Sequence, residues 1–210
     1  MRGHFITFEG GEGSGKTSVI EYLKDYFTDL GHNVVVTREP GGIEIAEQIR
    51  DIILSKENTA MDELTEAYLF AASRRQHLVE RVIPELEKGS MVLCDRFVDS
   101  SIVYQGYARG IGMGKVFDIN KVVIGDFMPD LTLFFDVKPE IGLKRIMDNS
   151  RNMNRLDLEK VNFHGKVYDG YIKLMEKYPS RIKAVNAERD IEEVKLETIK
   201  IVEDFLNDLK

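Results

Sequence analysis

The segment 5–17 constrains the fold of this chain more than any other. An apolar run at 5–9 leads into a glycine-rich turn at 10–15, and Lys16 and Thr17 follow directly. This spacing, G-x-x-x-x-G-K-[ST], is typical of a loop that binds phosphate groups. Glycine lets the backbone curl until its N–H groups converge, and the helix that follows adds the positive end of its dipole. We therefore expect a nucleoside triphosphate site in which Lys16 reaches the outer phosphates and the Thr17 hydroxyl binds Mg²⁺.

Composition and charge narrow the class of protein. The 210 residues, 43% hydrophobic and 31% charged, predict a single soluble domain over 1–210 with a substantial core. A net charge of −7 argues against a protein that coats nucleic acid. The single cysteine, Cys94, excludes an internal disulfide and favours a reducing compartment. Because we find neither a membrane-spanning apolar run nor a signal-peptide pattern, we expect a cytoplasmic protein with no membrane partner.

Strand-like and helix-like segments alternate along the chain, which predicts an α/β fold with helices on both faces of a five-stranded parallel sheet. We expect strands at 4–9, 33–38, 91–94, 131–136 and 183–186. Helices are expected at 16–30, 43–54, 62–88, 100–106, 116–124, 139–149, 162–178 and 192–209. The polar segment at about 150–160 suits a lid. The long helix should bury a stripe formed by Leu64, Tyr68, Ala71, Leu78, Val82 and Leu86.

A second anion site is expected beyond the carboxyl ends of the strands, where open parallel sheets bind ligands. Arg38 ends the second strand and Arg96 follows the third. Arginine grips phosphate with a planar fork, although either residue taken singly could form a surface ion pair. Asp95 could hold the water shell of the metal; Asp136 ends the fourth strand in a similar context, and only the neighbouring Arg96 favours Asp95.

The long helix carries a possible base site. Phe70 lies off the expected core stripe, with Arg74 one turn later on the same side. An aromatic ring beside a cation could stack on a base while the guanidinium reads its edge. The alternative is that Phe70 packs under a loop or in a subunit contact.

Several separate blocks resemble those of the thymidylate kinase family, and of its bacterial branch in particular. Their order and spacing agree over nearly the whole chain, and the block Thr-Arg-Glu-Pro-Gly-Gly is far more specific than the phosphate loop. The blocks are Phe-Glu-Gly-Gly-Glu-Gly-Ser-Gly-Lys-Thr at 8–17, Thr-Arg-Glu-Pro-Gly-Gly at 37–42, Leu-Phe-Ala-Ala-Ser-Arg-Arg at 69–75, Asp-Arg-Phe at 95–97, Tyr-Gln-Gly at 104–106 and Pro-Asp-Leu-Thr at 129–132. The resemblance implies the P-loop nucleoside-monophosphate-kinase fold and phosphorylation of dTMP to dTDP with ATP and Mg²⁺, in dTTP biosynthesis. It also implies a homodimer, in which the faces of the long helices are the expected contacts.

The resemblance also implies roles for individual residues. Phe70 would stack on thymine and Arg74 would bond a thymine carbonyl, while Arg38 and Arg96 would hold the dTMP phosphate. The base and sugar would further meet Ser101, Gln105, Tyr104 (favouring deoxyribose) and Glu12 (at the 3′ side of the sugar or the acceptor phosphate). ATP would be bound by Gly10, Gly11, Glu12, Gly13, Ser14, Gly15, Lys16, Thr17 and Ser18, with Thr17 and Asp95 at the metal. The catalytic set would be Lys16, Glu12, Arg96, Arg151 and Arg155.

Two departures from the family pattern bear on the lid and on the third strand. The phosphate loop carries no arginine, so the resemblance assigns the catalytic positive charge to Arg151 and Arg155. The lid reads Asn154-Arg155-Leu156-Asp157 where the family often has Asp-Arg-x-Glu, and Phe97 stands where Tyr or His is common.

Other interpretations of the sequence are a kinase for dUMP or dCMP, a regulatory nucleotide switch, and a nucleic-acid-dependent ATPase. The acidic charge and small size weigh against the last of these.

Overall fold

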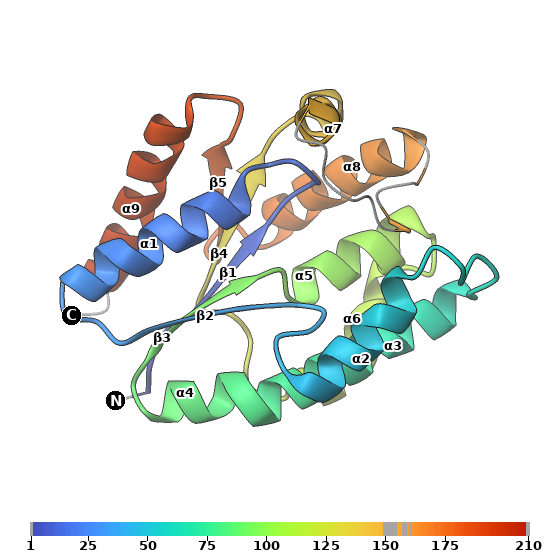
Figure 1. Cartoon of the computed structure of the whole chain (residues 1–210), viewed down its shortest axis with the longest axis horizontal. Helices are drawn as coiled ribbons and strands as arrows, with labels where there is room; N and C mark the ends of the chain where they lie inside the picture. The colour runs from blue at the N-terminus through green and yellow to red at the C-terminus, as the bar shows by residue number, and fades with distance from the viewer. Residues whose placement is uncertain (1, 149–154, 157–158, 160, 209–210) are drawn as a thin grey trace.

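A central parallel sheet organises the chain (Figure 1). In this computed structural model, residues 2–148, 155–156, 159 and 161–208 are described. The strands are β1 (Phe5–Glu9), β2 (Val34–Arg38), β3 (Met91–Asp95), β4 (Leu131–Asp136) and β5 (Ile182–Asn186), in the order β2-β3-β1-β4-β5. All four strand pairings are parallel, with Phe5 opposite Val92 and Ile6 opposite Leu131. The predicted five-stranded parallel sheet is therefore confirmed.

The helices follow the strands in alternation, as expected. They are α1 (Lys16–Asp29), α2 (Glu44–Leu54), α3 (Glu63–His77), α4 (Ile83–Glu87), α5 (Val98–Ser101), α6 (Met113–Ile124), α7 (Pro139–Asp148), α8 (Val161–Lys177) and α9 (Ile191–Asp208). Wide π-helical turns at Leu78–Val82 and Ile102–Ala108 continue α3 into α4 and extend α5. The expected helix 62–88 is thus one run with a changed pitch, and Pro84 lies in the first turn of α4.

Alternating strand residues build one core on each face of the sheet. Phe5, Cys94 and Phe134 pack with the two π-helical turns and with α4, α5, α6 and α8, while Ile6, Leu93 and Leu133 pack with α1 and α9. The Cys94 thiol is fully buried. Strand β2 is only partly buried, although its run of valines suggested burial on both faces, because it lies at the edge of the sheet. None of the described helices is long and apolar enough to cross a membrane.

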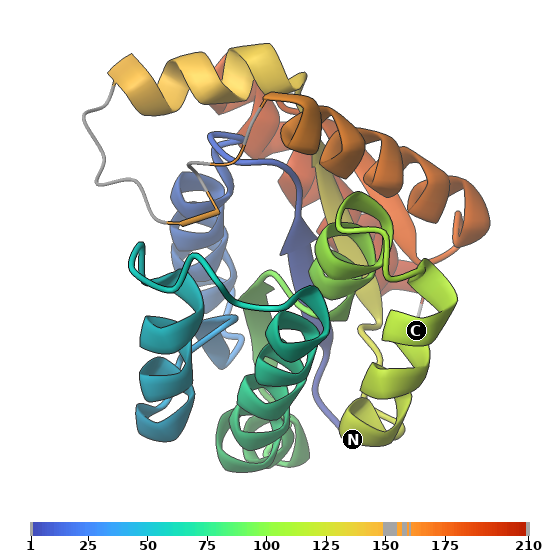
Figure 2. The same ribbon diagram turned by 90° about the vertical axis from the view of Figure 1, so that its right-hand side faces the viewer.

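The buried stripe expected on the long helix is wrong at its first two positions. Leu64 is 42% exposed and Tyr68 is 56% exposed, whereas Glu66, Phe70 and Arg74 are buried. Helix α3 lies between α2 and α6 (Figure 2), and its buried face carries polar and aromatic groups together with the small residues Ala67 and Ala71. Helix α3 therefore turns its functional residues inward.

Candidate active site

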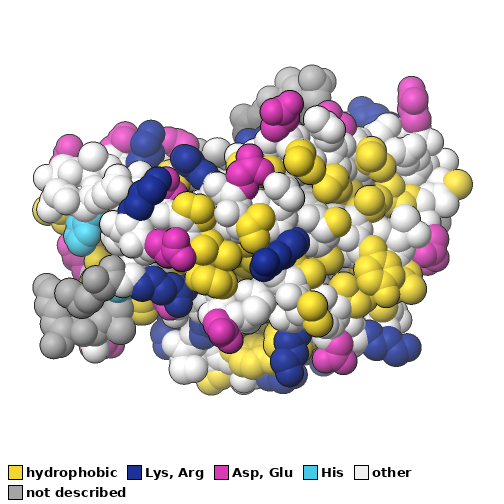
Figure 3. Space-filling view, turned by 90° about the horizontal axis from the view of Figure 1, so that it is seen from below, with side chains coloured by type: hydrophobic (Ala, Val, Ile, Leu, Met, Phe, Trp, Pro, Cys, Tyr) yellow, Lys and Arg dark blue, Asp and Glu magenta, His cyan; other side chains and the backbone are white. Residues whose placement is uncertain are grey.

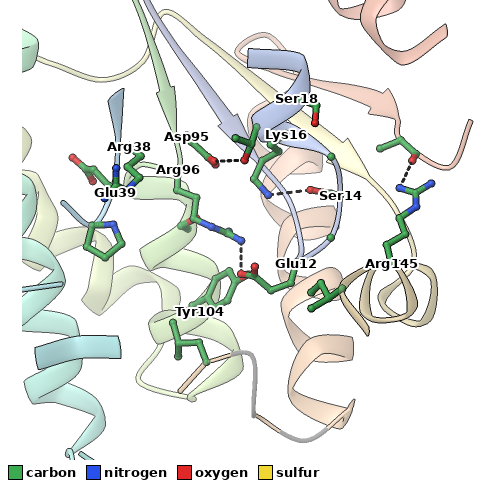
Figure 4. A pocket seen from close by; sticks show the side chains of 18 of the residues that line it. Glu12, Ser14, Lys16, Ser18, Arg38, Glu39, Asp95, Arg96, Tyr104 and Arg145 are labelled. Atoms are coloured by element: carbon green, nitrogen blue, oxygen red, sulfur yellow. Dashed lines mark hydrogen bonds and ion pairs between the residues drawn. The ribbon is translucent and has the colours of Figure 1, made fainter. Parts of the chain in front are cut away.

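The carboxyl ends of β1, β2 and β3 open into one cavity of about 1000 Å³ (Figure 4). The phosphate-binding loop forms its centre, since Glu12 to Ser18 all line it. One end of the cavity is lined by acceptor-side residues, namely Arg38, Glu39, Pro40, Arg50, Leu54, Phe70, Asp95, Arg96, Ser100, Tyr104, Gln105 and Leu156. The other end is lined by Arg145, Ile146, Ala187, Arg189, Asp190, Ile191 and Val194. The cavity can therefore hold two ligands that meet at the loop.

The loop adopts the conformation that the glycine pattern predicts. Gly13 and Gly15 have φ angles of 68° and 85°, which favour glycine, and α1 begins at Lys16 as expected. A side chain at Gly13 would collide with the backbone of Gly142 in α7, so the loop also packs closely on that helix. This close approach fixes the loop between the sheet and α7.

The Lys16 side chain folds back into the phosphate-binding loop and its amine binds loop oxygens. Its Nζ donates to Gly10 O at 3.3 Å, to Gly11 O at 3.1 Å and to Ser14 Oγ at 3.0 Å. Burial, together with the nearby Arg96, lowers the pKa of Lys16 to about 8, although the carboxylates of Asp95, Glu12 and Glu9 act against this. A bound phosphate would supply the counter-charge that the amine lacks here.

Arg96 holds the β3 end of the site against the loop. It has a left-handed backbone with a φ of 68°, and its guanidinium donates to Gly10 O at 2.9 Å and to Glu12 Oε1 at 2.5 Å. The guanidinium also lies over the Tyr104 ring, 5.2 Å from the centroid. The buried Glu9 carboxylate accepts hydrogen bonds from the Phe97 and Ser100 backbone N–H groups, which fixes the turn after β3. Burial raises the pKa of Glu9, and Asp99 adds to this effect.

Asp95 and Thr17 form a candidate metal position. The Thr17 hydroxyl lies 3.5 Å from Asp95 Oδ2. The other carboxylate oxygen, Oδ1, is buried and has no hydrogen-bond partner within the part of the chain that the structure describes. By contrast, Asp136 accepts a hydrogen bond from the Tyr168 hydroxyl. Burial of the tyrosine, and to a smaller extent this hydrogen bond, raise the pKa of Tyr168 to about 12. Of the two aspartates that the sequence left open, Asp95 is therefore the one beside the phosphate loop.

The base-side residues divide into an inner and an outer group. Phe70, Tyr104 and Gln105 line the cavity, and Phe70 packs with Ile53 and Leu156. Arg74 and Ser101 are 1% exposed and are not part of the lining formed by the described residues. Arg74 donates to Glu39 at 2.8 Å, to Phe97 O at 3.0 Å, to Ser101 Oγ at 3.2 Å and to Asn120 Oδ1. Arg74 therefore lies behind the wall of the pocket, where its hydrogen bonds fix the positions of Glu39, Phe97 and Ser101.

The lid residues are described only in part. Arg151, Asn154 and Asp157 lie outside the described residues. The Arg155 guanidinium donates to Ile53 O at 2.8 Å and to Glu66 Oε2 at 2.5 Å, and it is not part of the lining given by the described residues.

Three described arginines that line the cavity, Arg50, Arg145 and Arg189, were missed from the sequence. Arg50 on α2 lines the acceptor end and donates to Pro40 O at 2.7 Å; burial and the nearby Arg38 lower its pKa. It shares a helix face with the buried Ala46 and Ile53, and a charge on a buried stripe is the signal that could have found it. Arg145 on α7 lines the opposite end and donates to Ala187 O at 2.9 Å. No sequence signal set it apart from surface cations.

Comparisons with known proteins agree with this geometry. The family model for thymidylate kinase matches residues 8–198. A thymidylate kinase of Clostridium novyi is 57% identical over 92% of this chain and 95% of its own length. One from Oceanobacillus iheyensis is 56% identical over 99% of this chain and 93% of its own. The crystal structure of thymidylate kinase from Ehrlichia chaffeensis superposes on this chain with a TM-score of 0.78 at 34% sequence identity. The superposition covers 96% of this chain and 99% of the Ehrlichia chain. The chain belongs to the thymidylate kinase family, whose enzymes phosphorylate dTMP to dTDP with ATP as phosphoryl donor.

Proposed function

We propose that this enzyme transfers the γ-phosphate of ATP to dTMP at the point where the phosphate loop meets Arg96. The observation that carries the proposal is the single cavity in which the loop and the acceptor-side arginines face the same space. ATP would lie along the loop, from Gly10 to Ser18, with its base toward Arg145 and Ala187. The acceptor would enter between α2 and the α5 turn, with its phosphate toward the loop.

The chemical problem is electrostatic, because two polyanions must approach each other. A phosphate monoester is mostly dianionic near neutral pH, so its oxygen needs no strong general base. Lys16, the loop N–H groups, Arg38, Arg50 and Arg96 supply positive charge to offset the repulsion. The Arg38 guanidinium forms an ion pair with Glu47 Oε1 at 2.6 Å, and the Arg96 guanidinium forms one with Glu12. Both guanidinium groups are therefore oriented before the acceptor binds.

The residues at the end of β3 fit a magnesium ion. Mg²⁺ prefers oxygen ligands, keeps several waters, and in kinases is held by few protein groups plus the phosphates. Such oxygens are supplied by the Thr17 hydroxyl and by Asp95 Oδ1, which has no hydrogen-bond partner among the described residues. When bound there, Mg²⁺ would neutralise charge on the phosphates that Lys16 and the loop hold.

The acceptor base would stack on Phe70, while Tyr104 packs beside the sugar and Gln105 meets the edge of the base. Glu12 would face the sugar or the acceptor phosphate from within the loop. A direct bond from Arg74 to a thymine carbonyl, and a base contact by Ser101, stay predictions. The assignment of Arg151 and Arg155 as the cations that stabilise the transferring group also stays a prediction.

We also propose a homodimer that uses an exposed stripe along the outer face of α3. Leu64 and Tyr68 lie on this stripe, Val79 follows in the π-helical turn after α3, and Val122 on the adjoining α6 is 87% exposed. Figure 3 shows hydrophobic side chains gathered on the lower face, the side on which Figure 1 places α3 and α4.

We propose a reducing, cytoplasmic location for the enzyme, which the buried Cys94 thiol supports because it forms no disulfide.

An acceptor panel tests the proposed function. The purified enzyme is given ATP and Mg²⁺ with dTMP, dUMP, dCMP, AMP or GMP, and ADP release and acceptor phosphorylation are measured. We expect rapid dTDP formation and much slower reaction with AMP and GMP. ATP hydrolysis at the same rate with and without dTMP would exclude the transfer and favour a nucleotide switch.

A further inference from the structure

Glu66 on α3 is a buried carboxylate outside the cavity whose contacts converge on the acceptor pocket. Its side chain is 2% exposed. Oε1 accepts from Gln105 Nε2 at 2.9 Å, and Oε2 accepts from Arg155 at 2.5 Å and from Arg109 at 3.3 Å. Gln105 lines the cavity whereas Glu66 does not, so any effect of Glu66 on a ligand must pass through its partners.

The charge of Glu66 decides which end of the Gln105 amide it can bind. Burial alone would raise the pKa of Glu66, but Gln105, Arg109 and Arg155 together lower it, so the carboxylate stays ionised. An ionised carboxylate only accepts hydrogen bonds, so Gln105 must turn its NH₂ group toward Glu66. The amide carbonyl oxygen is then the atom that Gln105 can present to a base.

A carbonyl oxygen discriminates between pyrimidines by hydrogen bonding. Thymine and uracil carry an N–H donor at N3, whereas cytosine has a bare, accepting N3 beside an amino group. A site that pairs with a donor rejects a base that offers an acceptor there, because two acceptors would face each other without a proton. The reversed amide would suit cytosine instead.

We propose that Glu66 is a positioning residue that fixes the amide orientation of Gln105, and that it thereby makes the acceptor pocket select N3–H pyrimidines over cytosine. This inference rests on the proposed dTMP pocket. Arg155 and Arg109 both bind Oε2 of the carboxylate and help to hold it in place, and Arg109 Nε also donates to Oε1 at 3.4 Å. The Arg109 guanidinium lies over the Phe163 ring, 4.6 Å from its centroid.

The test is a comparison of acceptors in Glu66→Gln. A glutamine at this position can donate as well as accept, so the Gln105 amide is no longer held in one orientation. We expect the ratio of kcat/KM for dTMP to that for dCMP to fall at least about ten-fold, while the ratio for dTMP to dUMP stays near that of the wild type. An equal loss with dTMP and dCMP would overturn the proposal, because it would mean that Glu66 acts only through its ion pair with Arg155.

Two further variants complete the experiment. Glu63→Gln changes an exposed glutamate one turn earlier on α3 and should leave every acceptor ratio unchanged. Glu66→Asp keeps an accept-only carboxylate, so it should retain the discrimination against dCMP even where overall activity drops; loss of discrimination in this variant would contradict the proposal. Thermal unfolding checks that each variant folds. A wild-type enzyme that fails to phosphorylate dTMP would sink the proposed function, whereas an active wild type with an unchanged Glu66→Gln ratio would sink this inference alone.

Discussion

The Arg96 guanidinium donates to Glu12 Oε1 at 2.5 Å, an ion pair that joins the end of β3 to the phosphate loop. Both side chains are largely buried, at 17% and 14% exposed. Burial by itself would lower the pKa of Arg96, but Tyr104, Glu12, Tyr171 and Asp95 raise it well above its usual range. An acceptor phosphate must therefore share or displace Glu12, and Arg96 remains positively charged while it does so.

The first prediction concerns the fork of Arg96. Arg96→Lys keeps the charge but cannot reach Gly10 O, Ser100 and Glu12 together, so we expect kcat/KM for dTMP to fall about 100-fold. Steady-state kinetics with varied dTMP measure this. Arg81→Lys, at an exposed position, is the control and should behave as the wild type. Unchanged kinetics in Arg96→Lys would remove the guanidinium geometry from the reaction.

The second prediction concerns proton uptake when ATP binds. With its pKa lowered to about 8 from an ordinary 10.5, Lys16 is mostly neutral in the free enzyme at about pH 9. Bound phosphate stabilises the ammonium form, so ATP binding at this pH should take up a proton, and the affinity should fall as pH rises through about 8. Calorimetry in buffers of different ionisation enthalpy counts the proton. At about pH 7 Lys16 is already charged, so proton uptake by Lys16 on ATP binding should vanish. A proton count that does not change with pH would refute the assignment of the proton to Lys16.

The third prediction concerns the metal. Asp95→Asn should raise the Mg²⁺ concentration needed for half-maximal activity about 10- to 100-fold, since it weakens an oxygen ligand beside Thr17. Chelation of Mg²⁺ should abolish transfer in the wild type. Asp136→Asn serves as the matched control at the end of β4 and should shift the requirement little. If the Asp136 variant showed the larger shift, the metal would belong to β4.

The fourth prediction concerns Phe70. Its ring lines the cavity and is 9% exposed, so Phe70→Ala should remove base stacking and raise KM for dTMP about ten-fold. KM for ATP is the internal control and should stay near the wild-type value. Equal changes in both constants would point to a general loosening of α3.

The fifth prediction concerns assembly. Val122→Arg places a charge on the exposed apolar stripe of α3 and α6, so we expect a shift from dimer to monomer in light scattering coupled to size-exclusion chromatography. Leu196→Arg makes the same change at a residue that is 63% exposed on α9, which packs on the other face of the sheet, and should leave the mass unchanged. A monomeric wild type would contradict the proposed homodimer.

The sequence located the features that the sheet itself dictates. Arg38 and Arg96 were placed at one edge because parallel strands end together, and the start of α1 followed from the glycine spacing. Features that depend on helix packing were harder to predict. Helix α3 has apolar residues on both sides, so its periodicity could not show that Phe70 and Arg74 face inward. The pairing of Glu66 with Gln105 joins residues 39 positions apart and leaves no mark in the local sequence.

Helix α3 and the segment after β2 are joined by a buried chain of hydrogen bonds. Glu39 binds Arg74 at 2.8 Å and His77 at 2.9 Å, and His77 binds Thr37 at 2.6 Å. Because each group is the partner of another, a single substitution leaves a buried charge or polar atom unmatched. In evolutionary terms, the wall behind the acceptor pocket is expected to change by compensated pairs rather than one residue at a time.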